Sequence, residues 1–334
     1  MVNFILIFLI LNILFLLLLF KQYRLIDIYD HPDTILKKHE NSMPVFGGIL
    51  FYGNFIIFYL IDIMYFDYFF NNLNRFSLIF LISSTGILIM GLLDDKYNFT
   101  PIKKVFIILI FSTILIFSNP NLLITTLDLD LLSTIELNNY SFLFTIMCVF
   151  IFINAYNMLD GVDLNIAFYN FFLLIFFFYK SNYNFIFLTF IIANSFFLAL
   201  NFFKRSYFGN NGAYFFSFII SILSILYFNS SENVNEEDLV LVMLFPVIEL
   251  IRLFISRVAI NKSPFAGDNN HFHHISVKYF GRVWGIVFCQ ILIALPLLCD
   301  YLFKLNMWFN ILIFLVLYLS SFYYFKFLLL NKSE

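Results

Sequence analysis

Residues 76–96 read FSLIFLISSTGILIMGLLDDK, an apolar run that ends in two carboxylates and a lysine. The stretch 76–93 carries no charged side chain. At about 1.5 Å per residue, a helix of this length crosses most of the roughly 30 Å hydrocarbon layer of a bilayer. We therefore predict a membrane-spanning helix here, with Asp94, Asp95 and Lys96 at the point where it leaves the lipid.

The whole chain has the same apolar character. Of its 334 residues, 62% are hydrophobic and 12% are charged, and one soluble core could not bury so many long apolar runs. We predict an all-α polytopic membrane protein with one domain, residues 1–334, and 10 or 11 transmembrane helices, because two segments are short. The further segments that qualify are 4–20, 45–66, 104–119, 141–158, 164–179, 184–203, 213–228, 239–256, 283–299 and 307–325.

The basic residues predict an orientation. If the N-terminus lies outside, sixteen of the 19 lysines and arginines fall on the inner side, and Arg75, Lys180 and Lys304 fall on the outer side. Short loops rich in lysine and arginine stay in the cytoplasm. The expected cytoplasmic loops lie near 21–44, 94–103, 159–163, 204–212 and 257–282.

Composition and cysteine usage argue against other classes. The net charge of -2 gives no general attraction for a polyanion, so we expect no nucleic-acid partner. Cys148, Cys289 and Cys299 show no Cys-x-x-Cys spacing and predict neither a disulfide framework nor a zinc site. The first apolar run lacks a small-residue cleavage site, so we expect it to remain as the first helix.

The first inner loop combines basic and glycine residues. Lys37 and Lys38 could hold phosphate groups at the membrane surface, and Gly47-Gly48 could let the backbone approach a ligand closely. The alternative is a basic loop that only sets topology and contacts anionic lipid headgroups.

Acidic residues follow two of the predicted spans. Asp94 and Asp95 repel each other unless a cation or a lysine neutralises them, and magnesium suits carboxylate oxygens that also face a diphosphate. Asn157, Asp160 and Asp163 fall three apart and share one face if the helix continues. Ionisable groups beside a membrane span are costly and usually mark a site. The alternative for both groups is a purely structural or solvated helix end.

The last inner loop gathers three histidines, His271, His273 and His274. Their imidazoles could donate hydrogen bonds to a diphosphate or a sugar. A zinc site is a weaker interpretation because no second cluster of Cys or His accompanies them, and a surface tract without a role is the third. In the preceding span, Glu249 and Arg252 are three apart, so we expect a structural ion pair.

Taken in this order, the motifs resemble the polyprenyl-phosphate N-acetylhexosamine-1-phosphate transferase family over nearly the whole chain. The final motif is similar to the undecaprenyl-phosphate GlcNAc-1-phosphate transferase-like branch. The stretches that carry the resemblance are the 31–48 loop, Asp94-Asp95, NAYNMLDGVD at 154–163 and KSPFAGDNNHFHH at 262–274.

The resemblance implies a reaction, a cofactor and a location. An N-acetylhexosamine-1-phosphate, with UDP-GlcNAc as the expected donor, would pass to undecaprenyl phosphate, releasing UMP and starting a cell-envelope glycan. Mg²⁺, with Mn²⁺ as a substitute, would assist in the bacterial inner membrane, at a cytoplasmic site surrounded by membrane lipid. The oligomeric state stays open, a homodimer included.

The resemblance also assigns roles to residues. The implied catalytic residues are Asp94, Asp95, Asp160 and Asp163. The implied metal ligands are Asp95, Asp160, Asp163 and Asn210. The implied substrate-binding residues are Lys37, Lys38, Asn157, His271, His273 and His274.

One departure from the family pattern keeps alternatives open. Asn210 stands where a metal-binding carboxylate is expected, and a neutral amide should weaken the site. A catalytically silent relative that binds prenyl phosphate or a UDP-sugar is therefore the second interpretation. A transporter is the third, although transporters place polar groups near the bilayer midplane, whereas here these groups lie at the inner edge.

Overall fold

The structure is a computed structural model that describes residues 2–22, 29–30, 42–66, 74–129, 134–182, 184–230, 233–263 and 270–331. Within these ranges the chain forms twelve α-helices and two small antiparallel sheets of two strands each. The all-α expectation is confirmed.

The helices follow the predicted spans closely. Each of the eleven predicted segments coincides with a helix, and the short α10 is additional. The helices are α1 (Val2–Gln22), α2 (Gly47–Ile61), α3 (Arg75–Tyr97), α4 (Pro101–Ser118), α5 (Ser141–Asn157), α6 (Asn165–Lys180), α7 (Phe185–Phe202), α8 (Gly209–Ser230), α9 (Glu236–Ala259), α10 (Phe272–Phe280), α11 (Arg282–Phe303) and α12 (Met307–Asn331).

Nine helices in the described part of the chain are long and apolar enough to cross a membrane. The apolar stretches Phe4–Phe15 and Asn165–Lys180 are shorter. Of the two segments predicted to be short, 164–179 is therefore short, whereas 213–228 lies within the 22-residue α8. The helix bundle therefore has the character of a polytopic membrane protein.

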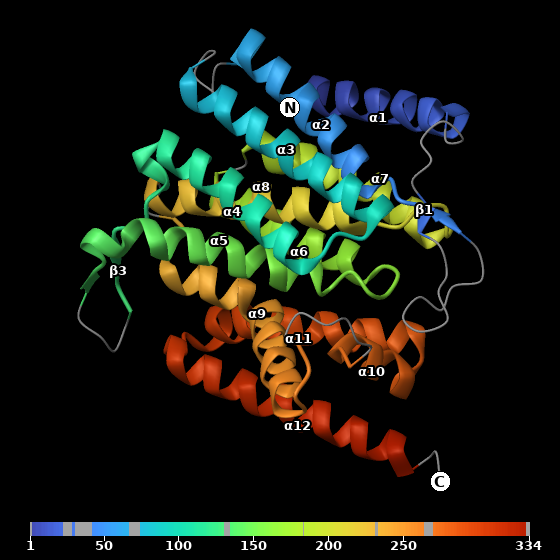
Figure 1. Ribbon diagram of the computed structural model, residues 1–334, viewed down its shortest axis with the longest axis vertical. Helices are drawn as coiled ribbons and strands as arrows, with labels where there is room; N and C mark the ends of the chain where they lie inside the picture. Colours follow the sequence, from blue (N-terminus) through green and yellow to red (C-terminus); the bar gives the residue numbers. More distant parts are fainter. Residues whose placement is uncertain are drawn as a thin grey trace.

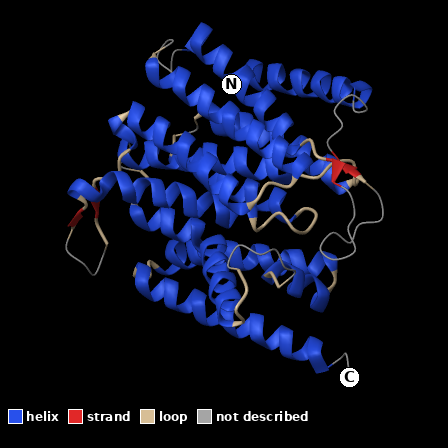
Figure 2. Ribbon diagram, viewed as in Figure 1, coloured by secondary structure: helices blue, strands red, loops and turns tan. Residues whose placement is uncertain are grey.

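Most of the helices lie side by side, with α1 at one flank and α12 at the other (Figure 1). The two sheets lie at opposite ends of the bundle, as Figure 2 shows. Strands β1 (Tyr29–Asp30) and β2 (Met43–Pro44) pair at one end, and β3 (Thr126–Leu127) and β4 (Ile135–Glu136) pair at the other.

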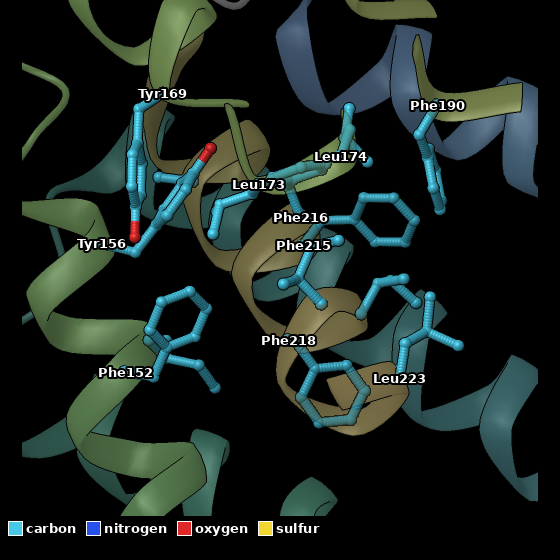
Figure 3. Packing of buried hydrophobic residues seen from close by; sticks show 14 of the residues in the cluster. Phe152, Tyr156, Tyr169, Leu173, Leu174, Phe190, Phe215, Phe216, Phe218 and Leu223 are labelled. Atoms are coloured by element: carbon cyan, nitrogen blue, oxygen red, sulfur yellow. The ribbon is translucent and has the colours of Figure 1, made fainter. Parts of the chain in front are cut away.

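Helix α8 occupies the centre and contacts α2, α3 and α5. It is apolar on all sides, as expected for a helix without a solvent face. Aromatic side chains fill the space around it, among them Phe215, Phe216 and Phe218 of α8 and Tyr156 of α5 (Figure 3). This packing fixes the position of the first turn of α8 inside the bundle.

Small residues let the backbones approach one another near this first turn. The backbone N–H of Gly48 in α2 donates to Oδ1 of Asn211 at 2.7 Å. A Cβ added to Gly91 of α3 would overlap the backbone of Asn211. Since even an alanine would force these helices apart, glycine is required where α2, α3 and α8 meet.

Helix α5 ends within one residue of the predicted 141–158 span and does not continue through Asp163. Helix α5 stops at Asn157, and residues 158–164 form turns that lead into α6. Leu164 adopts a left-handed conformation with φ of 70°, and its N–H donates to Oδ1 of Asn201 at 2.6 Å. The condition under which Asn157, Asp160 and Asp163 would share one helical face is therefore not met, because this contact with α7 favours a turn.

Candidate functional site

Two carboxylates converge on the N-terminus of α8. Asp95, at the end of α3, accepts hydrogen bonds from the backbone N–H groups of Asn210 (2.9 Å) and Asn211 (3.0 Å) and from Nδ2 of Asn211 (2.6 Å). Oδ2 of Asp160 accepts from the N–H of Gly209 at 3.0 Å. A helix N-terminus offers unpaired N–H groups and a partial positive charge, so it attracts anions. The two acids are thereby brought together across α3, the 158–164 turn and α8.

Asp94 has different partners from its neighbour. Its side chain is fully buried, and its Oδ2 lies 2.7 Å from Nζ of Lys104 in α4. Its Oδ1 accepts from the backbone N–H of Phe99 at 2.8 Å. The repulsion predicted between Asp94 and Asp95 is therefore relieved by separate groups, a lysine for one and helix amides for the other.

The remaining polar residues of the 154–163 motif point to two other helices. Nδ2 of Asn157 donates to the hydroxyl of Tyr214 in α8 at 3.3 Å. Asp163 forms an ion pair with Arg282, the first residue of α11, at 2.9 Å. Because 40% of the Arg282 side chain is exposed, solvent weakens this pair.

The three histidines lie together at the start of α10, and we call His271, His273 and His274 the histidine segment. The rings of His273 and His274 are 4.5 Å apart, and those of His271 and His273 are 5.3 Å apart. A Cβ added to Gly161 would lie 2.5 Å from Nε2 of His273 and 2.9 Å from Nε2 of His274. The 158–164 turn therefore packs directly against the histidine segment.

His273 is the most enclosed of the three. Its side chain is buried, and neither ring nitrogen has a hydrogen-bond partner among the described residues. Burial is the main reason why the pKa of His273 lies well below its usual value, and the neighbouring His274 and His271 lower it further. A neutral imidazole can donate one hydrogen bond and accept another, so His273 could meet a polar ligand group from either nitrogen.

The expected ion pair of Glu249 and Arg252 is confirmed. Nη2 of Arg252 lies 2.9 Å from Oε1 of Glu249, and both side chains are buried. Glu249 also accepts from the backbone N–H of Phe272 at 2.9 Å, which joins the pair to the histidine segment.

The four expected metal ligands fit a cation only in part. Asp95 and Asp160 lie at the N-terminus of α8, where Asn210 is also found, and these side chains carry the hard oxygens that magnesium prefers. Both oxygens of Asp95 already accept hydrogen bonds, however, and Asp163 is paired with Arg282. Within the described ranges no group of three or more His, Cys, Asp or Glu side chains could hold a metal ion.

Two of the expected substrate-binding residues, Lys37 and Lys38, lie outside the described residues. Sequence reasoning did not identify Lys104, Asn211, Tyr214 or Arg282 as partners of the expected site residues. The sequence does contain a signal for Asn211, because this residue lies between Gly209 and Gly212, in a short polar stretch just before a long apolar run. For Tyr214 and Arg282 the contact joins elements that are distant in the sequence, whereas Lys104 lies on the helix that directly follows Asp94.

The fold and this site define a class, a polytopic membrane protein with carboxylates and imidazoles gathered where its helices meet. Residues 77–228 match the model of glycosyl transferase family 4. The chain is also 25% identical, over 264 residues, to the undecaprenyl-phosphate alpha-N-acetylglucosaminyl 1-phosphate transferase of Thermotoga maritima, an alignment that covers 77% of this chain and 75% of that protein. The family model and this relative agree with the resemblance seen in the motifs, and residues 77–228 are the part of the chain that the family model matches.

The family match covers the acidic part of the site but not the histidines. It includes Asp94, Asp95, Asp160 and Asn210, and it ends at residue 228. Glu249 and the histidine segment lie beyond it.

Proposed function

We propose that this protein transfers an N-acetylhexosamine-1-phosphate from a UDP-sugar to undecaprenyl phosphate, releases UMP and thereby starts a cell-envelope glycan. The donor that we propose is UDP-N-acetylglucosamine, the sugar named in the Thermotoga maritima relative. The observation that carries the proposal is the convergence of Asp95 and Asp160 on the amides of α8, beside the turn that packs on His273.

The proposed step is a phosphoryl transfer. An oxygen of the lipid phosphate forms a bond to the β-phosphorus of the UDP-sugar, and the bond from that phosphorus to the bridging oxygen breaks. The bridging oxygen keeps the electron pair and leaves with UMP. Such a reaction depends on positioning and on neutralising charge more than on covalent chemistry by the protein.

The two adjacent acids have distinct roles in this proposal. A phosphate monoester is already largely doubly ionised near neutral pH, so it needs little help from a base. Asp94 holds the ammonium of Lys104 in place at 2.7 Å. Lys104, with Lys37 and Lys38, then attracts the lipid phosphate, while Asp95 fixes the start of α8.

On the donor side, the proposal assigns the diphosphate and the sugar to Asn157, Asp163 and the histidine segment. Asp163 lies in the 158–164 turn, Asn157 precedes this turn at the end of α5, and the histidine segment packs against the turn from the start of α10. Imidazole N–H groups in a site shielded from water make strong hydrogen bonds to phosphate oxygens.

We also propose that Mg²⁺, replaceable by Mn²⁺, is the cofactor. Asp160 and Asn210 are the residues that would hold it, together with the donor diphosphate. When bound, it would neutralise negative charge on the transferred phosphate. With Asn210 in place of a carboxylate, the site carries one negative charge fewer than the family pattern.

The assay uses purified protein in nanodiscs with undecaprenyl phosphate, a panel of labelled UDP-sugars, and either magnesium or EDTA. We expect a lipid-linked sugar and UMP with UDP-N-acetylglucosamine and magnesium, and neither with EDTA. If no sugar of the panel yields a product, the transferase proposal fails.

Asn210 favours a second candidate, a silent relative that binds its ligands without turnover. The same protein would then bind UDP-sugar in equilibrium dialysis while forming no UMP. Product formation by the wild-type chain excludes this candidate.

A further inference from the structure

Glu249 lies within α9 and is fully buried, and its carboxylate accepts hydrogen bonds from several donors. It accepts hydrogen bonds from Nε (3.1 Å) and Nη2 (2.9 Å) of Arg252 and from the hydroxyl of Tyr318 in α12. It also accepts from the backbone N–H of Phe272, the first residue of α10, at 2.9 Å. One side chain thus joins α9, α10 and α12.

Arg252 extends the same contact to the segment before α10. Its Nη2 donates to the backbone carbonyl of Asn270 at 2.7 Å, and its guanidinium lies 3.8 Å from the ring centroid of Phe322. The pair therefore holds the backbone at both residues that flank His271. Nδ1 of His271 lies 3.6 Å from Oε1 of Glu249.

Helix α10 depends on this contact because its own cap is missing. His271 occupies the N-cap position but makes no side-chain capping hydrogen bond. The first N–H groups of a helix need acceptors from elsewhere. Glu249 supplies one from another helix, and the acceptor is tied to Arg252 and Tyr318, so its position is fixed.

We propose that Glu249 is a positioning residue: with Arg252, it fixes residues 270–272 so that the histidine segment faces the 158–164 turn. The consequence for catalysis rests on the proposed transferase function. The positioning itself does not, since it concerns only the contacts of Glu249, Arg252 and the start of α10.

Stability alone is a poor explanation for this pair. Replacing a buried ion pair by apolar side chains of similar volume is often neutral, whereas removing one partner leaves an unpaired charge. The pair does something that apolar residues could not do, because it binds one backbone N–H and one backbone C=O of the same short segment. This argues for a role in orientation.

The test compares the double variant E249M/R252M with the wild type in nanodiscs. The control is Asp238→Asn, which removes another largely buried acid of α9, paired with Lys180 at 2.7 Å. Three quantities are measured: the unfolding temperature, the rate at which diethyl pyrocarbonate modifies His273, located by mass spectrometry, and the KM for each substrate.

For the double variant we expect an unfolding temperature within a few degrees of the wild type, together with a His273 modification rate at least tenfold higher. The KM for the UDP-sugar should rise at least tenfold, and the KM for undecaprenyl phosphate should change less than twofold. The Asp238→Asn control should keep the wild-type modification rate and both KM values. A folded double variant with wild-type protection of His273 would overturn the proposal.

The variant Glu249→Asp keeps the charge but shortens the side chain by one methylene, so it provides a second test if the double variant does not fold. It should leave His273 modified severalfold faster than in the wild type. Unchanged protection in this variant contradicts the positioning role. Because modification of His273 by diethyl pyrocarbonate does not require turnover, it tests the positioning role of Glu249 even if the transferase assay gives no product.

Discussion

At the scale of single residues, the proposed magnesium site includes Asn210, a neutral amide where the family pattern has a carboxylate. Its backbone N–H donates to Asp95 at 2.9 Å, so its place at the start of α8 is fixed. We predict that Asn210→Asp lowers the magnesium concentration for half-maximal rate about tenfold, which corresponds to about 1.4 kcal/mol. A magnesium titration of the initial rate measures this, with Asn210→Ala as the control. An unchanged titration would reject Asn210 as a metal ligand.

His273 gives the protein a predicted sensitivity to acid. Burial lowers the pKa of its imidazole, so the unfolded chain binds a proton more readily than the folded one. Stability should therefore be lost as the pH falls below about 6.5, the usual histidine value. Between pH 7.5 and 5.5 we expect the unfolding temperature of the wild type to fall about 2–4 °C more than that of His273→Gln. Equal falls in the two proteins would contradict this assignment.

At the scale of elements, the 158–164 turn packs tightly against α10. A methyl group at Gly161 would lie 2.5 Å from Nε2 of His273, so the His273 ring or the turn would have to shift. We predict that Gly161→Ala lowers the transfer rate at least tenfold while the unfolding temperature changes by only a few degrees. The control is Gly53→Ala in α2, whose added methyl meets only the ring of Phe15, at 3.2 Å. Equal rates in the two variants would show that this contact is not needed.

The same elements show what the sequence could and could not predict. Spans of 18 or so apolar residues are determined by the thickness of the bilayer, so hydropathy located them without tertiary information. Helix α10, with 9 residues, is too short for that signal. The end of α5 was predicted within one residue, but the conformation of the 158–164 turn depends on a contact between Leu164 and Asn201, 37 positions away, which no local pattern reveals.

The site itself was predicted by residue type but not by partner. Asp95 belongs to an obvious acidic pair, yet its three donors come from residues 115 and 116 positions further along the chain. The pairing of Asp94 with Lys104 likewise depends on how α3 and α4 pack. Motifs thus indicated candidate groups, and only the packing of the helices showed which of them contact one another.

At the scale of the whole molecule, α8 links the site to the opposite end of the bundle. It has 22 residues, so at about 1.5 Å per residue it spans roughly 33 Å, close to the hydrocarbon thickness of a bilayer. Its first turn binds the acids of the site, Asp95 and Asp160, and its last turn leads toward Asn233. The two ends must therefore face opposite sides of the membrane.

The distribution of basic residues predicts which side is which, and accessible cysteines can test it. We expect Arg205, just before α8, to face the cytoplasm and Asn233, just after it, to face outward; both side chains are exposed. In a background with Cys148, Cys289 and Cys299 changed to alanine, a membrane-impermeant maleimide should label Asn233→Cys in intact cells. It should label Arg205→Cys only after the membrane is permeabilised. The reverse pattern would place the acids and the histidine segment outside, away from cytoplasmic nucleotide sugars, and would contradict both the orientation and the proposed function.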